Sequence, residues 1–259
     1  MPLNRKLKTT FGKVSGLYHS ARIGYASKLF SDIVKISNIK KNSVILDVGS
    51  GTGKSAEFFA KHGYNLIGLD IGKELVSIAK AELQNYPNLS FKIGSFEKTK
   101  FKPNTFDLII SGQAFHWLDP YVACKNSAKF LKKGGFLAIF SKFQKKDLKF
   151  SPKIWELFIR HCPDYPADKL NYLSYAINIS EKINKSNLFF KPIIKKYNSK
   201  FKYSKKQYRD LIMSFSWTSS LNKGRKELFL KELGKMLNSR KWPYYVTYDN
   251  VLIIAKVKK

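Results

Sequence analysis

The 259-residue sequence has few of the residues and runs that mark disulfide-rich, metal-binding or membrane-spanning proteins. Its two cysteines, Cys124 and Cys162, are too few for a disulfide framework or a cysteine metal cluster. No apolar run approaches the roughly 18 residues that a membrane span needs, and the basic N-terminus has no apolar signal-peptide segment. We therefore expect a cytoplasmic protein, monomeric or weakly dimeric, with no bound metal.

Acidic residues are also scarce, with 18 Asp and Glu against 48 Lys and Arg, which gives a net charge of +30. Only six of the 48 are arginine, the side chain that phosphate-binding proteins favour. The abundance of lysine beside asparagine and isoleucine is what an AT-rich coding bias would produce. Nucleic acid is a partner that the charge allows and no motif supports.

The stretch from Lys182 to Arg209 contains no acidic residue. Aromatic residues alternate with lysines in its second half, where they could stack on nucleic-acid bases. The same alternation is typical of a half-buried strand with solvated lysines. Both alternatives stay open, and the aromatic residues concerned are Tyr197, Phe201, Tyr203 and Tyr208.

Hydrophobic residues make up 44% of the chain, enough for a substantial core, and their spacing alternates between strand and helix. Such alternation predicts an α/β fold with a parallel sheet and helices on both faces. The expected strands are 44–48, 65–69, 89–93, 106–110 and 136–140, and the expected helices are 21–38, 56–61, 73–83 and 119–131. Beyond residue 141 we expect helices at 152–161, 170–185, 204–213 and 223–237 and strands at 193–201 and 250–257.

A glycine-rich loop follows the first expected strand and precedes the first helix after it, with Gly49, Gly51 and Gly53 in the spacing G-x-G-x-G. Glycines allow a tight turn there and a close approach of a ligand to the backbone. Asp70 ends the next strand, 21 residues after Gly49, where an acid accepts hydrogen bonds from ribose hydroxyls. The spacing is neither the dinucleotide fingerprint nor a P-loop. Because Asp47 stands at the loop entrance, a cationic nucleoside ligand fits better than a phosphate.

These segments together resemble the class I S-adenosylmethionine-dependent methyltransferases. The resemblance rests on VILDVGSGTGKSAEFFA, GLDIGKELV, FDLIISGQAFHWLD and FLKKGGFLAIF, in this order and spacing, and it covers residues 18–141. QAFHW at 113–117, with Tyr18, Arg22 and Tyr25, is similar to the subgroup that includes relatives of trans-aconitate methyltransferase. The resemblance implies a Rossmann-like, seven-stranded, mostly parallel sheet with a helical cap over the C-terminal strand edge.

The resemblance also implies a role for each matching residue. The three glycines would hold the methionine end of S-adenosylmethionine, with Asp47 near its ammonium group and Asp70 at the ribose. Many relatives have an acid where this chain has Ser95. The remaining residues implied to contact the cofactor are Ile71, Ser95, Phe96, Ser111 and Gln113.

The acceptor side is defined less sharply, because a carboxylate acceptor needs no base, whereas a hydroxyl or an acidic carbon does. His116 follows the fourth strand, where the acceptor should arrive, and is the candidate base. His62 and His161 are expected at helix ends, and His19 could face the same region. We predict that Tyr18, Arg22 and Trp117 contact the substrate.

The expected function is methyl transfer from S-adenosylmethionine to a small molecule that carries a carboxylate. An RNA methyltransferase and a non-catalytic S-adenosylmethionine-binding protein are the alternatives. We expect one domain over residues 1–259, with the cofactor-binding core at 18–141, cap elements at 145–187 and 204–245, and final strands at 189–201 and 246–257.

Overall fold

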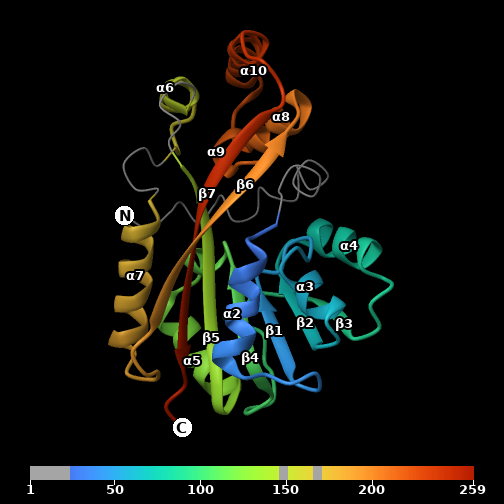
Figure 1. Cartoon of the computed structure of the whole chain (residues 1–259), viewed down its shortest axis with the longest axis vertical. Coiled ribbons are helices and arrows are strands. Elements are labelled where there is room, and N and C mark those ends of the chain that lie inside the picture. The colour runs from blue at the N-terminus through green and yellow to red at the C-terminus, as the bar shows by residue number, and fades with distance from the viewer. Residues whose placement is uncertain (1–23, 146–150, 166–170) are drawn as a thin grey trace. The chain divides into compact units, whose positions relative to one another are not determined.

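A computed structural model describes residues 24–145, 151–165 and 171–259. Its centre is a seven-stranded sheet with the strand order β3-β2-β1-β4-β5-β7-β6 (Figure 1). The strands are β1 (Val44–Val48), β2 (Asn65–Asp70), β3 (Leu89–Ile93), β4 (Phe106–Gly112), β5 (Leu131–Gln144), β6 (Ile193–Tyr203) and β7 (Tyr244–Lys256).

The strands from β3 to β5 are parallel neighbours, and this confirms the parallel sheet that the sequence predicted. β7 runs antiparallel to β5, since Val257 donates its backbone N–H to Gly135 while Lys145 donates to Thr247. The two late strands therefore complete the sheet, as the family resemblance implied.

The helices also follow the predicted order. Asp119 caps α5 through its side chain, and Ser204 and Gln207 form a reciprocal capping box at the start of α8. The helices are α2 (Ser27–Ser37), α3 (Ala56–Lys61), α4 (Lys73–Glu82), α5 (Pro120–Phe130), α6 (Ser151–His161), α7 (Tyr172–Lys185), α8 (Lys205–Met213), α9 (Ser216–Ser219) and α10 (Lys223–Asn238). The short α9 and the 3-10 helix η2 (Phe115–Trp117) were not predicted.

The start of β5 differs from the prediction. We expected Gly134 and Gly135 to close the preceding helix, with the strand beginning at Phe136. In the structure Leu131 already pairs with Phe106, and the register shifts before Phe136 pairs with Leu108. Gly134 has a φ of +79° within this irregular stretch, so the glycines make a bulge inside the strand rather than a helix end.

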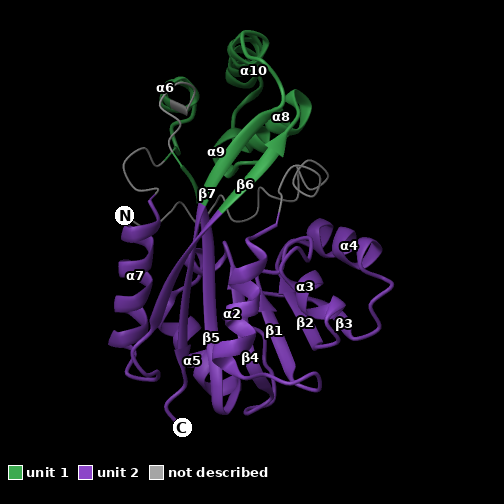
Figure 2. Cartoon of the chain, in the orientation of Figure 1, with its two compact units in different colours: residues 1–23, 143–170, 199–248 green, residues 24–142, 171–198, 249–259 purple. Residues whose placement is uncertain are grey.

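The described chain divides into two compact units, each continuous in space but not in sequence (Figure 2). The sheet-containing unit, purple in Figure 2, holds β1 to β4 and comprises residues 24–142, 171–198 and 249–259; the described residues of the other unit, green in Figure 2, lie within 143–170 and 199–248. The helix α7 belongs to the sheet-containing unit, although the predicted cap included it. The division into core and cap stays a prediction.

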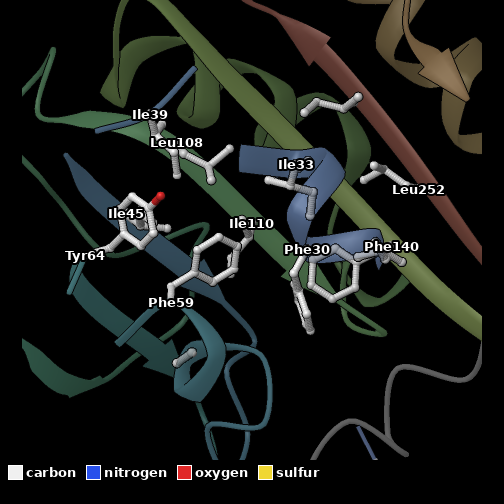
Figure 3. Close-up of a cluster of buried hydrophobic side chains, with 14 of the residues drawn as sticks. Phe30, Ile33, Ile39, Ile45, Phe59, Tyr64, Leu108, Ile110, Phe140 and Leu252 are labelled. Atoms are coloured by element: carbon white, nitrogen blue, oxygen red, sulfur yellow. The ribbon is translucent and has the colours of Figure 1, made fainter. Parts of the chain in front are cut away.

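The core of the sheet-containing unit lies between the sheet and the helices α2 and α3 (Figure 3). Ile45 and Leu108 pair across β1 and β4 and point to the same face, because paired residues of parallel strands share a side. The residues that meet there are all buried: Leu29, Phe30, Ile33, Phe59, Ile110, Phe140 and Leu252. This packing fixes the positions of β1 and β4, whose carboxyl ends carry the predicted site.

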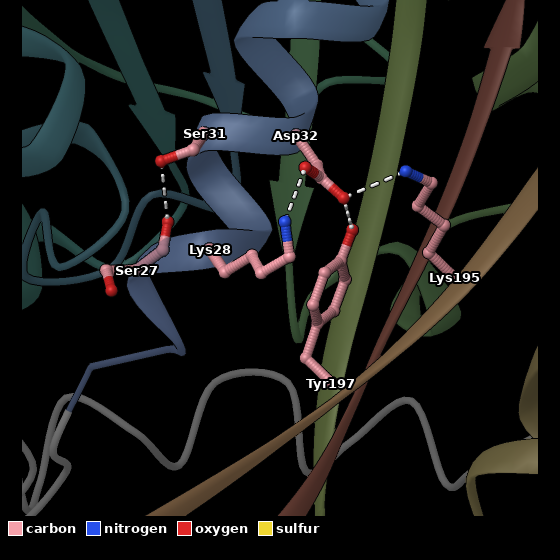
Figure 4. Close-up of polar contacts among 6 residues, drawn as sticks. All are labelled: Ser27, Lys28, Ser31, Asp32, Lys195 and Tyr197. Atoms are coloured by element: carbon pink, nitrogen blue, oxygen red, sulfur yellow. Dashed lines mark hydrogen bonds and ion pairs between the residues drawn. The ribbon is translucent and has the colours of Figure 1, made fainter.

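A buried carboxylate connects α2 with β6. Asp32 is 7% exposed and accepts hydrogen bonds from the Tyr197 hydroxyl at 2.8 Å and the Lys195 ammonium at 2.9 Å, with Lys28 at 3.4 Å (Figure 4). These donors, Lys195 first, lower the pKa of Asp32 to about 2. The charged form of Asp32 therefore stabilises the fold.

Replacing Asp32 with asparagine should cost about 1–3 kcal/mol of unfolding free energy at pH 7, because buried donors lose a charged acceptor. The folded pKa lies below the ordinary 3.8, so this contribution is complete above about pH 5 and is lost as the pH falls towards 2. Urea unfolding of wild type and Asp32→Asn at pH 7 and pH 3 measures the difference. An equal deficit at both pH values would show that the Asp32 charge does not stabilise the fold.

Residues 193–203 of the basic segment form β6, which confirms the strand alternative for them, while Tyr208 lies in α8. Three tyrosines of the basic segment are buried: Tyr197 is 8% exposed, Tyr203 0% and Tyr208 1%. Lys195 and Lys196 make ion pairs with Asp32 and Asp249. These tyrosine rings are therefore core residues and do not present a stacking surface for bases.

Both cysteines are buried free thiols. Burial raises the pKa of Cys124 to about 11 and that of Cys162 to about 12, so neither thiol is a nucleophile near neutral pH. Among the described residues, no helix is both long and apolar enough to cross a membrane.

Candidate functional site

The glycine loop folds over the carboxyl end of β2. Gly49, Gly51 and Gly53 have φ values of +71°, +54° and +80°, the left-handed region that side chains disfavour. The backbone N–H groups of Gly49 and Ser50 both donate to the Leu69 carbonyl, at 2.8 and 3.2 Å. The loop therefore lies next to the end of the second strand, as the sequence predicted.

The same loop leaves no room for side chains at two of its glycines. A Cβ on Gly49 would lie 2.2 Å from the Cβ of Ala114, and one on Gly53 would lie 2.4 Å from Cδ1 of Leu83. The segment after β4 is thus pressed directly against the glycine loop, which brings residues 113–117 to the site.

Asp70 uses both of its carboxylate oxygens to organise this edge of the sheet. Oδ2 accepts the backbone N–H of Gly51 at 2.8 Å, and Oδ1 accepts that of Gly72 at 2.8 Å. Each carboxylate oxygen has a further lone pair. The side chain is partly exposed, so it can accept hydrogen bonds from vicinal hydroxyls while it fixes the loop.

Asp47 lies at the end of β1 beneath the loop, with 0% of its surface exposed. Within the ranges that the structure describes, neither of its oxygens has a partner at hydrogen-bond geometry. Burial raises the pKa of Asp47 to about 7; the nearby Ser55 hydroxyl lowers it and the Asp70 charge raises it further. A buried carboxylate with free acceptor capacity suits a cationic partner.

In the ligand-free protein, this raised pKa makes stability fall as the pH rises. Between the ordinary pKa of 3.8 and the folded value of about 7, the folded state binds a proton that the unfolded state has lost. Stability should decline over this range by up to about 1.4 kcal/mol per pH unit and then level off.

An Asp47→Asn variant lacks this titration, so its stability relative to wild type should be greater at pH 8 than at pH 5. Denaturant unfolding of both proteins at the two pH values measures the change. A constant difference between them would mean that Asp47 is charged throughout.

The residues at the end of β4 are held tightly. Ser111 is 0% exposed and donates its hydroxyl to the Val48 carbonyl at 2.9 Å, which joins β4 to β1. Gln113 has a φ of +57°, an uncommon conformation for a residue with a side chain, and its N–H donates to Phe140. Their contacts with a cofactor stay predictions, and for Ser111 only a small part of the side chain could take part.

Three further predicted cofactor residues lie beyond the carboxyl ends of β2 and β3. Ile71 is half-buried, and Phe96 is buried against the ring of Phe130. The Ser95 hydroxyl donates to the carboxylate of Glu97, two residues on. Sequence reasoning missed Glu97, which supplies an acid near the position where many relatives have one.

The predicted acceptor side is formed by η2 and its neighbours. His116 and Trp117 lie side by side, with ring centroids 5.1 Å apart. The ring of Tyr175, from α7, lies 6.0 Å from that of His116. Sequence reasoning missed Tyr175, because nothing in the local pattern of α7 links it to residue 116.

The other predictions for this side have varied outcomes. His62 follows α3 and His161 ends α6, as expected, and His161 lies 3.0 Å from Glu232. Tyr18, His19 and Arg22 lie outside the described residues, so their contacts stay predictions.

Comparison with known proteins shows which families and folds this chain is similar to. Residues 46–139 match the family model described as a methyltransferase domain. The uncharacterized methyltransferase Rv3342 of Mycobacterium tuberculosis is 27% identical over 135 residues, which are 52% of this chain and 53% of Rv3342. The chain thus spans about half the length of the curated relatives it matches first.

Two solved structures share the fold. YcgJ from Bacillus subtilis has a TM-score of 0.58 and 18% identity, with 90% of this chain and 100% of YcgJ covered. Phosphoethanolamine N-methyltransferase 2 of Haemonchus contortus, solved with phosphomonomethylethanolamine and S-adenosylhomocysteine, has a TM-score of 0.57 and 15% identity. The match covers 96% of this chain and 58% of the Haemonchus chain.

The solved structures show that the fold is that of Rossmann-like methyltransferases. Residues 46–139 match a methyltransferase domain, in agreement with the resemblance to class I S-adenosylmethionine-dependent methyltransferases, and this match supports S-adenosylmethionine as the cofactor. The residues present fit this cofactor, because a sulfonium with an ammonium group needs a buried acceptor such as Asp47 and a backbone that it can approach closely. These matches do not single out the trans-aconitate methyltransferase subgroup.

Proposed function

We propose that this protein transfers a methyl group from S-adenosylmethionine to a small-molecule acceptor. The observation that carries the proposal is the buried carboxylate of Asp47 beneath a glycine loop, with Asp70 at the end of the neighbouring strand. A degenerate site would have little reason to hold a buried carboxylate beside a glycine whose Cβ would clash with Ala114.

The roles of the residues follow from their positions. Asp47 and the loop from Gly49 to Gly53 hold the amino-acid end of the cofactor, and Asp70 holds the ribose hydroxyls. Ile71, Ser95 and Phe96 border the adenine, while Ser111 and Gln113 lie on the side of the methyl group. When bound, S-adenosylmethionine supplies an electrophilic methyl group on sulfur.

The protein's task is then to align a nucleophile behind that methyl group and to exclude water. His116 lies where the acceptor should arrive, within the aromatic neighbourhood of Trp117 and Tyr175. A carboxylate would react without a base, whereas a hydroxyl would use His116. The Haemonchus protein, of the same fold, binds a small phosphorylated amine, which supports a small molecule as the acceptor class.

RNA is the less favoured acceptor. The positive charge of the chain is its main support, yet the tyrosines of the basic strand that could stack on bases are buried. Lys195 and Lys196 are also partly neutralised by ion pairs. A small acceptor requires none of these features.

Calorimetry with S-adenosylmethionine, and with NAD as the control ligand, tests the cofactor site. We expect binding on the order of micromolar for the former and none for NAD. Transfer of label from [methyl-³H]S-adenosylmethionine to carboxylic acids, hydroxy compounds, amines and RNA then tests the acceptor. Binding without transfer to any small molecule, or transfer to RNA alone, would overturn the proposal.

A further inference from the structure

Three elements bring polar side chains together near the carboxyl end of β4: η2, β5 and α7. His116 stands in η2, four residues after Gly112 at the end of β4. Gly112 pairs with Phe140, so Ser141 is the next residue of β5 beyond that pair. Tyr175 comes from the first turn of α7, and its ring lies nearly perpendicular to that of His116, at an interplanar angle of 81°.

The polar atoms of these three side chains lie in the protein interior. Nδ1 of His116, the hydroxyl of Tyr175 and the hydroxyl of Ser141 are all buried. Placing polar atoms in the interior carries a desolvation cost that apolar side chains would avoid.

Anchoring of α7 does not account for Tyr175. The helix already buries Ala176, Ile179 and Ile183, which are 1%, 1% and 0% exposed. It packs along α5, on the side of the sheet unit to which both belong. A tyrosine directed at η2 adds a contact that the packing of the helix does not require.

We propose that Tyr175 is a positioning residue for methyl transfer, whose ring holds the imidazole of His116 in the orientation that faces the incoming acceptor. This inference rests on the proposed function. Trp117 bounds the same imidazole at 5.1 Å, so the ring of His116 is fixed between two aromatic neighbours from different elements. The Tyr175 ring meets the imidazole edge to face, at 81°, a geometry that aromatic pairs favour over a face-to-face sandwich, while the Trp117 ring is tilted at 41°.

The chemistry of Tyr175 agrees with positioning rather than proton transfer. Burial raises its pKa to about 12, and the Ser141 hydroxyl lowers it in part. The phenol thus stays neutral near pH 7 and does not accept a proton from the acceptor. The ring contact, not the ionisation of the phenol, is the feature that acts on His116.

The full-length chain offers a matched set of variants. Tyr175→Phe keeps the ring and removes the hydroxyl, whereas Tyr175→Leu removes the ring. Tyr172→Leu is the control, since Tyr172 lies one turn earlier on α7 and its ring contacts Lys196 rather than His116. Thermal unfolding and calorimetry with S-adenosylmethionine report whether each variant folds and binds the cofactor.

The first readout needs no acceptor. The chain has four histidines, so ¹³C-histidine labelling gives few ring signals, and a His116→Gln variant assigns the one of interest. With S-adenosylhomocysteine bound, Tyr175→Leu should shift the His116 signals, while Tyr175→Phe and Tyr172→Leu leave them close to wild type. Unchanged His116 signals in Tyr175→Leu would overturn the proposal.

The second readout is label transfer from [methyl-³H]S-adenosylmethionine to the acceptor that the small-molecule screen yields. Tyr175→Leu should lower kcat at least tenfold with the KM for S-adenosylmethionine within twofold, and Tyr175→Phe should retain kcat within threefold. An equal loss in Tyr175→Phe or in Tyr172→Leu would refute a role for the ring. If wild type binds the cofactor but methylates nothing, the proposed function fails, and the histidine signals alone decide whether Tyr175 holds His116.

Discussion

An Asp70→Ala variant is expected to lose S-adenosylmethionine binding by roughly 100-fold or more, about 2.7 kcal/mol. The carboxylate accepts the backbone N–H groups of Gly51 and Gly72 and would also accept the ribose hydroxyls. Hydrogen bonds to a charged group contribute about 1.5–3 kcal/mol each, so the loss of two ribose contacts accounts for the effect. Removal of the side chain also takes away the acceptor for the backbone N–H of Gly51, at the centre of the glycine loop. Calorimetric titration of the purified variant measures the change.

Asp107 offers a matched control for this variant. Its carboxylate likewise accepts a backbone N–H, that of Val44 at 2.8 Å, and pairs with Lys132, but Asp107 lies near the other end of β4. Asp107→Asn should bind S-adenosylmethionine like wild type, while Asp70→Asn should be intermediate because one acceptor oxygen is kept. Affinity within twofold of wild type in Asp70→Ala would show that the ribose does not bind there.

A Gly49→Ala variant is expected to lose cofactor binding and to unfold at a lower temperature. The new Cβ would stand 2.2 Å from the Cβ of Ala114, and the φ of +71° is strained for any side chain. The strain alone costs about 1–2 kcal/mol. The clash must also push residues 113–117 away from the loop, which removes Gln113 and His116 from the site.

Gly63→Ala separates strain from the clash. Gly63 has a similar φ of +83°, but a Cβ there would meet nothing within 4 Å. Gly63→Ala should lose unfolding free energy only by the strain cost and should bind S-adenosylmethionine like wild type. The affinity of Gly49→Ala for S-adenosylmethionine should fall at least 100-fold. Equal binding by the two variants would mean that the contact with Ala114 does not shape the site.

The parallel core and the donor half of the site could be predicted from the sequence, because both depend on local patterns. Short apolar runs give strands, and the carboxyl ends of neighbouring parallel strands meet at one edge. Asp47, the loop glycines and Asp70 therefore had to be close together once the strand order was known. The start of α8 at Ser204 could be predicted for the same reason, because a helix cap depends only on neighbouring residues.

Segments whose local sequence fits two conformations equally well could not be assigned from the sequence. Gly134 and Gly135 favour a helix end and a strand bulge alike, and the pairing of Leu131 with Phe106 selected the bulge. The tyrosines of the basic segment suited a binding surface or a half-buried strand. Their burial was decided by which other elements cover β6, a property that the alternation of residues does not contain.

The acceptor side shows the same division most clearly. His116 had to follow the fourth strand, because its place in the chain puts it there. Tyr175 meets it only through folding, since residues 59 positions apart come together when α7 packs along α5. Local propensity determines what a segment forms, while long-range packing determines which side chains share a site, and that packing sums many weak contacts that no single segment encodes.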